Sequence, residues 1–292
     1  MKFGAGALVA FSGLCAFATP ARADENLFGY TYGAETQPKG TNEAYLWVTD
    51  RRGKDDGHYD AQDYRLELER GLTNRLQGSV YLNFESHHIR GLDPELPSVD
   101  RDFGFQGIST EFKYNVLSPY KDGLGLAFYV EPGWSRIRKV EGDKVTELEL
   151  ELKAIVQKNF MDDRLVWAAN LTFEPEWERE KEVDAITGEV EREWEKELAV
   201  EFTTGLAYRV APNWYLEVEG RYHSEYPDWT EGLHREHYAL FAGPSIHYGG
   251  KRWWFTATYL PQLYGKPNGP GSSLHLDEHE KRELRLKVGY NF

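Results

Sequence analysis

The sequence has 292 residues, of which 34 are basic and 48 acidic, so its formal net charge at pH 7 is −14. A chain this acidic lacks the broad basic surface that nucleic-acid binding uses, and its single cysteine, Cys15, excludes a disulfide framework or a cysteine-ligated metal. A mean hydropathy of −0.63, with no apolar run of 18 residues after residue 23, excludes a helical membrane protein but not the half-polar strands of a β-barrel.

Residues 1–23 have the pattern of a cleaved secretory signal peptide. Lys2 precedes an apolar run over residues 3–18, and small residues at 21–23 offer a cleavage site after Ala23. The apolar run is shorter than the roughly 20 residues that a membrane-spanning helix needs. Cleavage removes two basic residues and no acidic ones, which leaves a formal charge of −16. We therefore expect export to the outer membrane of a Gram-negative cell.

Residues 24–41 precede the first predicted strand. We expect this segment to lie on the periplasmic side of a barrel or to fold into its lumen. Its aromatic pair, Tyr30 and Tyr32, suits packing against other side chains better than display on a surface.

From residue 42 onward, apolar and polar residues alternate in about twelve segments, which is typical of β-strands with one apolar face. In residues 76–85, for example, the apolar side chains and a glycine fall on the even positions. The first strand, 42–51, is ambiguous, because the set that contains Leu46 and the set that contains Trp47 compete for the outer face.

The connections between these strands alternate in length. Short turns fall at 71–75, 160–164, 210–213 and 249–251, and long loops at 86–103, 174–197, 225–235 and 265–280. This asymmetry predicts an all-β protein: a single transmembrane antiparallel β-barrel of about twelve strands over residues 42–292, with short periplasmic turns and long extracellular loops. A closed sheet pairs every backbone group in lipid, so the apolar face points outward. A soluble β-sandwich or lipocalin-like barrel would turn that face inward and leaves the loop asymmetry unexplained.

The last strand, 284–292, alternates apolar and polar positions and ends on Tyr290 and Phe292. This ending resembles the signal by which the barrel-assembly machinery recognises bacterial outer-membrane proteins, so we assign both residues to such a signal. Aromatic residues beside the short turns or at the chain end predict an interfacial girdle: Trp214, Trp253, Trp254, Tyr114, Tyr208, Tyr248, Tyr290 and Phe292.

The polar face of the strands must line the lumen. The predicted lining residues are Glu67, Glu69, Glu85, Glu111, Glu131, Glu149, Glu151, Glu217, Glu219, Arg65, Arg221, Arg285 and Lys287. Rings of carboxylates favour cations, so this set predicts a narrow channel for small, cationic solutes. Twelve strands lie between the barrels that side chains fill and those that leave a channel, so a lumen plugged by paired charges is the alternative. A non-conducting surface barrel that binds partners or divalent cations through its acidic loops is a second alternative.

Six of the nine histidines form three doublets in predicted loops: His87/His88, His234/His237 and His275/His279. Such spacings can chelate a metal when they lie on a helix. These segments are rich in Gly, Pro and Asp, however, so we interpret the doublets as solvated loop histidines and assign no metal and no cofactor.

An outer-membrane enzyme is a further alternative, because phospholipases of that membrane are also twelve-stranded barrels. Such an enzyme needs a serine and a histidine within reach of each other. His223 and Ser224 are sequence neighbours and so point to opposite faces of a strand. We assign no catalytic residue and expect no enzyme activity.

The acidic segment 174–197 continues two predicted strands, which favours a β-hairpin that stands in water above the membrane. Residues 27–38 (LFGYTYGAETQP) and 71–84 (GLTNRLQGSVYLNF) resemble an uncharacterised family of proteobacterial outer-membrane barrels that carries a domain-of-unknown-function label. The resemblance implies the fold but no substrate. We expect a monomer whose partners are outer-membrane lipid, the barrel-assembly machinery and small solutes.

Overall fold

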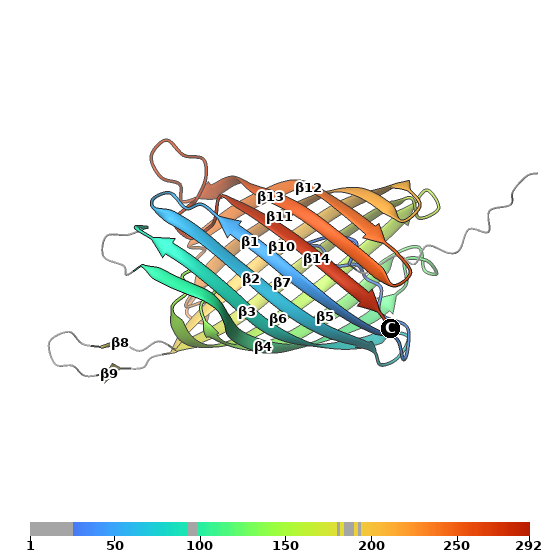
Figure 1. Ribbon diagram of the computed structural model, residues 1–292, viewed down its shortest axis with the longest axis horizontal. Helices are drawn as coiled ribbons and strands as arrows, with labels where there is room; N and C mark the ends of the chain where they lie inside the picture. The colour runs from blue at the N-terminus through green and yellow to red at the C-terminus, as the bar shows by residue number, and fades with distance from the viewer. Residues whose placement is uncertain (1–25, 93–97, 180–181, 184–189, 192–193) are drawn as a thin grey trace, which may run out of the picture.

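The computed structural model describes residues 26–92, 98–179, 182–183, 190–191 and 194–292, and within these residues twelve strands form one closed antiparallel barrel (Figure 1). The barrel strands are β1 (Asn42–Arg52), β2 (His58–Gly71), β3 (Leu76–Arg90), β4 (Val99–Leu117), β5 (Gly125–Ile137), β6 (Lys144–Phe160), β7 (Leu165–Arg179), β10 (Trp194–Ala211), β11 (Trp214–Pro227), β12 (His237–Gly249), β13 (Trp253–Lys266) and β14 (Arg282–Asn291). The predicted signal peptide, 1–23, lies outside the described residues. No helix in the described part of the chain is long and apolar enough to span a membrane.

The barrel closes where β1 pairs with β14, in a continuous register from Glu43↔Asn291 to Arg52↔Arg282. The backbone N–H of Asn42 donates to the carbonyl of Phe292 (3.3 Å), and the N–H of Phe292 donates back to Asn42 (3.0 Å). Every other neighbouring pair in the barrel follows the chain order. The prediction of an all-β, twelve-stranded antiparallel barrel is therefore confirmed.

The two ends of the barrel differ. The short-turn end carries both ends of the sheet and the connections 72–75, 118–124, 161–164, 212–213 and 250–252. The long-loop end, on the left in Figure 1, carries the connections 53–57, 91–98, 138–143, 180–193, 228–236 and 267–281. Strands β7 and β10 stay paired as far as Arg179 and Trp194, and the short strands β8 (Glu182–Val183) and β9 (Val190–Glu191) pair with each other beyond them. The described parts of the acidic segment, 174–179, 182–183, 190–191 and 194–197, are thus paired as in a hairpin.

Several strands run further toward the long-loop end than expected. Strand β3 extends to Arg90, so His87 and His88 are strand residues and not loop residues. His87 is fully buried inside the barrel, where its Nε2 lies 3.0 Å from the carbonyl of Lys139. The interpretation of this doublet as solvated loop histidines is wrong, because the ladder between β2 and β3 continues through both residues.

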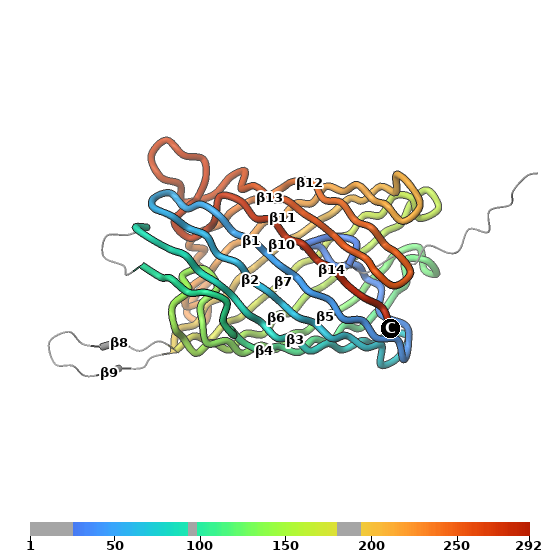
Figure 2. The backbone as a smooth tube through the Cα atoms, in the orientation of Figure 1, coloured from blue at the N-terminus to red at the C-terminus, as the bar shows by residue number. Residues whose placement is uncertain are grey.

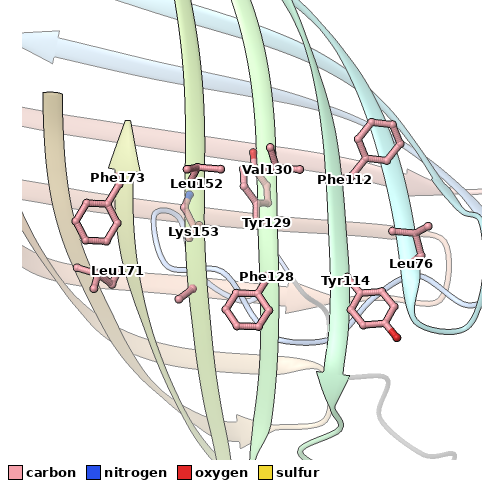
Figure 3. A pocket seen from close by; sticks show the side chains of 11 residues that line it. Leu76, Phe112, Tyr114, Phe128, Tyr129, Val130, Leu152, Lys153, Leu171 and Phe173 are labelled. Carbon is pink, nitrogen blue, oxygen red and sulfur yellow. The ribbon is translucent and has the colours of Figure 1, made fainter. Parts of the chain in front are cut away.

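The outer wall of the barrel is apolar. Figure 3 shows this wall across β3 to β7, where Phe112, Phe128 and Phe173 flank a shallow groove of about 450 Å³. Leucines on neighbouring strands complete the groove, among them Leu152 and Leu171. Because the lining is mainly hydrocarbon, the groove suits lipid acyl chains.

The register of β1 settles which side chains face outward. Leu46 pairs with Leu66 on β2 and with Val288 on β14, and these three side chains share the exposed outer face. Tyr45 and Trp47 point into the barrel and are buried.

One member of the predicted girdle lies elsewhere. Trp254 is 1% exposed and its indole N–H donates to Glu43 inside the barrel, whereas its neighbour Trp253 is 60% exposed on the outer wall. Successive strand residues face opposite sides, so two adjacent tryptophans cannot both lie in an outer girdle.

Replacing Val218 with Arg is expected to lower the free energy of unfolding in lipid vesicles by about 2–4 kcal/mol, the cost of a charge on the lipid face near mid-membrane. Val218 is 62% exposed near the middle of β11. A denaturant titration of the vesicle-inserted protein measures the change. Leu233→Arg is the matched control, because Leu233 is 69% exposed in the connection 228–236 and its replacement should cost less than about 0.5 kcal/mol. Equal costs at the two positions would show that the outer wall does not meet lipid.

Candidate functional site

Residues 26–38, which we call the lumenal segment, fold into the lumen near the short-turn end. Figure 2 shows its blue trace inside the barrel, near the end at which the C-terminus lies. Residues 26–34 are buried. The carboxylate of Glu219 on β11 accepts the backbone N–H groups of Gly29, Tyr30 and Thr31 at 2.8, 2.9 and 3.1 Å. A lumen carboxylate therefore holds the turn that enters the barrel.

Side-chain amides on other strands hold the rest of this segment. Asn170 on β7 accepts the N–H of Tyr32 (2.6 Å) and donates to its carbonyl (3.0 Å). Gln157 on β6 accepts the N–H of Ala34 (2.8 Å), and Asn115 on β4 donates to the carbonyl of Ala34 (2.6 Å). Buried backbone groups need partners, and here lumen side chains supply them in place of a sheet ladder.

Above the lumenal segment, basic side chains lie on aromatic rings, and we call this arrangement the basic-aromatic layer. The guanidinium of Arg285 lies 3.7 Å from the ring centroid of Tyr30, and the ammonium of Lys153 lies 4.1 Å from that of Tyr32. Lys287 lies 4.2 Å from a ring of Trp47. Such cation–π contacts are strongest away from water, so the layer fixes both tyrosines of the lumenal segment in place.

Beyond this layer, a cavity of about 460 Å³ opens toward the long-loop end, and we call it the vestibule. Its floor includes Tyr30, Tyr32 and Trp47. Its lining holds 17 Asp and Glu residues against 7 Lys and Arg residues. The vestibule is therefore strongly acidic, and Arg285 and Lys153 of the basic-aromatic layer are among its basic residues.

Two loop carboxyl groups of the vestibule have raised pKa values. Burial and the neighbouring Glu283 raise the pKa of Glu280 to about 8, against the opposing effect of Arg51 and Arg221. Desolvation by the surrounding lumen wall raises the pKa of Glu141 to about 7, although its side chain is 40% exposed and Arg138 and Lys54 act in the opposite direction. The charge of the vestibule consequently changes between pH 6 and pH 9.

Most of the predicted lining residues separate by depth, and Glu85, which lies across from the vestibule residue Asp63, is the exception. Those that line the vestibule are Glu131, Glu149, Glu151, Arg65, Arg221 and Arg285. Those buried outside the vestibule lining are Glu67, Glu69, Glu85, Glu111, Glu217, Glu219 and Lys287. Several of these bind protein groups: Glu111 accepts the hydroxyl of Tyr81, and Lys287 donates to the carbonyl of Phe28 at 3.3 Å. The two ends of the predicted charge ladder thus have different roles.

Histidines also converge at the vestibule, which the sequence pattern did not predict. His237 is the first residue of β12 and lies directly across from Glu225 on β11. The rings of His275 and His279, from the connection 267–281, lie 5.2 and 4.9 Å from that of His237. All three rings are buried, so the solvated-loop interpretation is wrong for them.

Two groups of side chains in the described residues could hold a cation. Glu197, Glu225 and His237 form the first, and Glu147, Glu149 and Glu176 form the second; in each, the ligand atoms lie within 4.8 Å of one another.

The pair His223 and Ser224 does not assemble a nucleophile. His223 lines the vestibule, whereas the hydroxyl of Ser224 donates to the carbonyl of Val200 at 3.1 Å. The two side chains have separate partners.

The model of a family of unknown function, DUF6662, matches residues 20–292, which confirms the resemblance to an uncharacterised family. No curated protein sequence matches the chain significantly. Among solved structures, the COG4313 outer membrane channel from Pseudomonas putida F1 is 15% identical with a TM-score of 0.57, over 89% of this chain and 98% of that one. The translocator domain of the autotransporter NalP from Neisseria meningitidis (11%, TM-score 0.53, 86% and 88%) and the NanC porin (11%, TM-score 0.50, 85% and 98%) are also similar. At these identities the likeness concerns the fold, which is that of outer-membrane β-barrels.

Proposed function

We propose that this chain, which belongs to the DUF6662 family of unknown function, is a narrow channel for small cationic solutes that its lumenal segment closes at rest. The observation that carries the proposal is the vestibule, with its 17 acidic and 7 basic side chains. Carboxylates that line a water-filled passage favour cations over anions. A concave acidic surface with low-dielectric walls also raises the local cation concentration.

Closure by the lumenal segment is reversible in this proposal. Its backbone is held by side chains such as Glu219 and Asn170, and β1 begins only at Asn42. The segment can therefore leave without breaking the sheet.

Reversal potentials in planar bilayers test the proposal. With a KCl gradient across the bilayer, we expect a cation-selective current whose selectivity rises between pH 6 and pH 9. The reason is that Glu141 and Glu280 have pKa values of about 7 and 8, so raising the pH ionises both carboxyl groups and adds negative charge.

Anion selectivity would contradict the cation preference, and a bilayer that stays silent even when the lumenal segment is destabilised would favour a non-conducting surface barrel. Steady hydrolysis of phospholipid by the purified protein would favour an enzyme instead. The bilayer recording measures conductance and the hydrolysis assay measures enzyme activity, so the two alternatives are distinguishable.

The location and partners belong to the same proposal. We place the barrel in the Gram-negative outer membrane, reached through the secretory signal peptide, with the short-turn end in the periplasm. Lipid is the partner of the apolar outer wall, and Tyr290 and Phe292, whose rings stack with centroids 6.2 Å apart, are the contact for the barrel-assembly machinery. The chain acts as a monomer without a catalytic centre.

A further inference from the structure

One side of the vestibule carries a group of side chains that combines two carboxylates with an imidazole. Strand pairing brings it together: Glu225 on β11 lies across from His237 on β12 and from Ala199 on β10, and Glu197 is two residues before Ala199. The Nε2 atom of His237 lies 3.0 Å from one oxygen of Glu225. The side chain of His237 is 5% exposed, so this nitrogen sits at the wall and not in bulk water.

Neighbouring histidines orient the side chains of Glu225 and His237. The Nε2 of His223 lies 2.8 Å from the other oxygen of Glu225. The Nδ1 of His237 lies 3.0 Å from the Nε2 of His279. Residues that bind metal are usually held by a second layer of hydrogen bonds, typically to the free nitrogen of a histidine and the free oxygen of a carboxylate. That second layer is present here for both.

We propose that Glu197, Glu225 and His237 form a binding site for a single divalent transition-metal ion of the zinc class. The ligand atoms of these residues lie within 4.8 Å of one another, and a single ion needs ligand atoms at roughly 2.0–2.2 Å from it, so a contraction of the side chains around the ion completes the site. Three protein ligands leave a coordination position that faces the vestibule, open to water or to a solute.

The hydrogen-bond partners of His237 and His279 allow the proton of His237 to leave Nε2 when a metal binds there. Without metal, the Nε2–H of His237 points to Glu225, and its Nδ1 accepts from His279. With metal on Nε2, the His237 proton moves to Nδ1 and donates to the Nε2 of His279, whose own proton moves to Nδ1. The two nitrogens lie 3.0 Å apart, so the Nε2 of His279 is placed to accept this hydrogen bond.

The second group of possible cation ligands differs from the proposed site in the atoms that it offers. Glu147, Glu149 and Glu176 offer oxygen atoms alone, and the ammonium of Lys139 lies 3.7 Å from Glu149. Each group thus has a basic neighbour, Lys139 here and His223 beside Glu225 at 2.8 Å, so the two groups differ in their ligand atoms. An imidazole nitrogen adds preference for zinc-class ions over calcium, which takes six to eight oxygen ligands. The site stands independently of ion passage through the barrel.

Zinc titration of the full barrel, refolded in detergent and followed by calorimetry, tests the site. We expect one Zn²⁺ ion bound per chain, with Ca²⁺ at least about tenfold weaker because of the imidazole ligand. His237→Ala and Glu225→Gln should each weaken Zn²⁺ binding by about tenfold or more. The matched control is His234→Ala, which removes an exposed histidine three positions away and should leave binding unchanged.

Two further measurements keep the outcome decisive. Heat-dependent migration on gels shows whether each variant is a folded barrel, and His237→Gln serves if the alanine variant does not fold. Cu²⁺ used as a probe should show coupling to one imidazole nitrogen by electron paramagnetic resonance, and this signature should vanish in the His237 variant. Zinc affinity that survives loss of His237, or calcium binding as tight as zinc binding, would overturn the proposal.

Discussion

Replacing Gly29 with Ala is expected to raise the mean single-barrel conductance by about tenfold or more. An added Cβ would lie 2.7 Å from the Cβ of Thr258 and 3.3 Å from an oxygen of Glu219, closer than atoms at ordinary contact. Glu219 holds three backbone N–H groups of the lumenal segment and also accepts the hydroxyl of Thr258 at 2.9 Å. Losing even one hydrogen bond to a charged group costs about 1.5–3 kcal/mol, which shifts a closed-to-open equilibrium by about tenfold or more. Planar-bilayer recordings measure the change.

Gly220→Ala is the matched control for this prediction. Gly220 follows Glu219 on β11, but a Cβ there would meet its nearest neighbour, the Cγ2 of Thr204, at an ordinary 3.9 Å. Its conductance should equal that of the unmodified protein. If Gly29→Ala folds and conducts no more than the control, the lumenal segment does not close the barrel.

Replacing Glu149 with Lys should reduce the cation preference of the open barrel severalfold. The substitution changes the charge of the vestibule by two units, and the new ammonium would face Lys139, whose charge now lies 3.7 Å from Glu149. Exposed charges are screened within a Debye length of about 10 Å at 0.1 M salt and about 3 Å at 1 M. The difference between Glu149→Lys and the unmodified protein should therefore shrink as the salt concentration rises. Reversal potentials in the Gly29→Ala background give a current large enough to measure this.

The control for charge alone is Glu231→Lys. Glu231 is exposed in the connection 228–236 and does not line the vestibule. The same two-unit change there should leave selectivity nearly as it was. A comparable loss at both positions would mean that overall charge, and not the vestibule lining, sets the preference.

The barrel itself was predictable from the sequence because lipid imposes one rule on every strand. Where apolar side chains fall on every second position, as in residues 76–85, they must face the lipid, and the polar side chains between them must face the lumen. The same rule resolves β1 in favour of Leu46 outside. It also places Trp254 inside the barrel, because its neighbour Trp253 lies on the outer face.

The candidate sites were less predictable because they depend on register and on a segment without periodicity. His237 and Glu225 are twelve positions apart, and only the pairing of β11 with β12 makes them neighbours. His279 arrives from another connection, 42 residues further along the chain. The lumenal segment has no strand pattern. Its place in the lumen follows from hydrogen bonds to Glu219 and Asn170, which the local sequence does not predict.

The anchor points of the lumenal segment have a mechanical consequence. They lie on strands far apart around the wall: Asn115 on β4, Gln157 on β6, Asn170 on β7, Glu219 on β11, Thr256 on β13 and Lys287 on β14. A segment that is hydrogen-bonded to so many strands links opposite walls of the barrel across the lumen. Its departure would free opposite walls to move independently, so the width of the pore and the stiffness of the cylinder around it are governed by the same thirteen-residue stretch, 26–38.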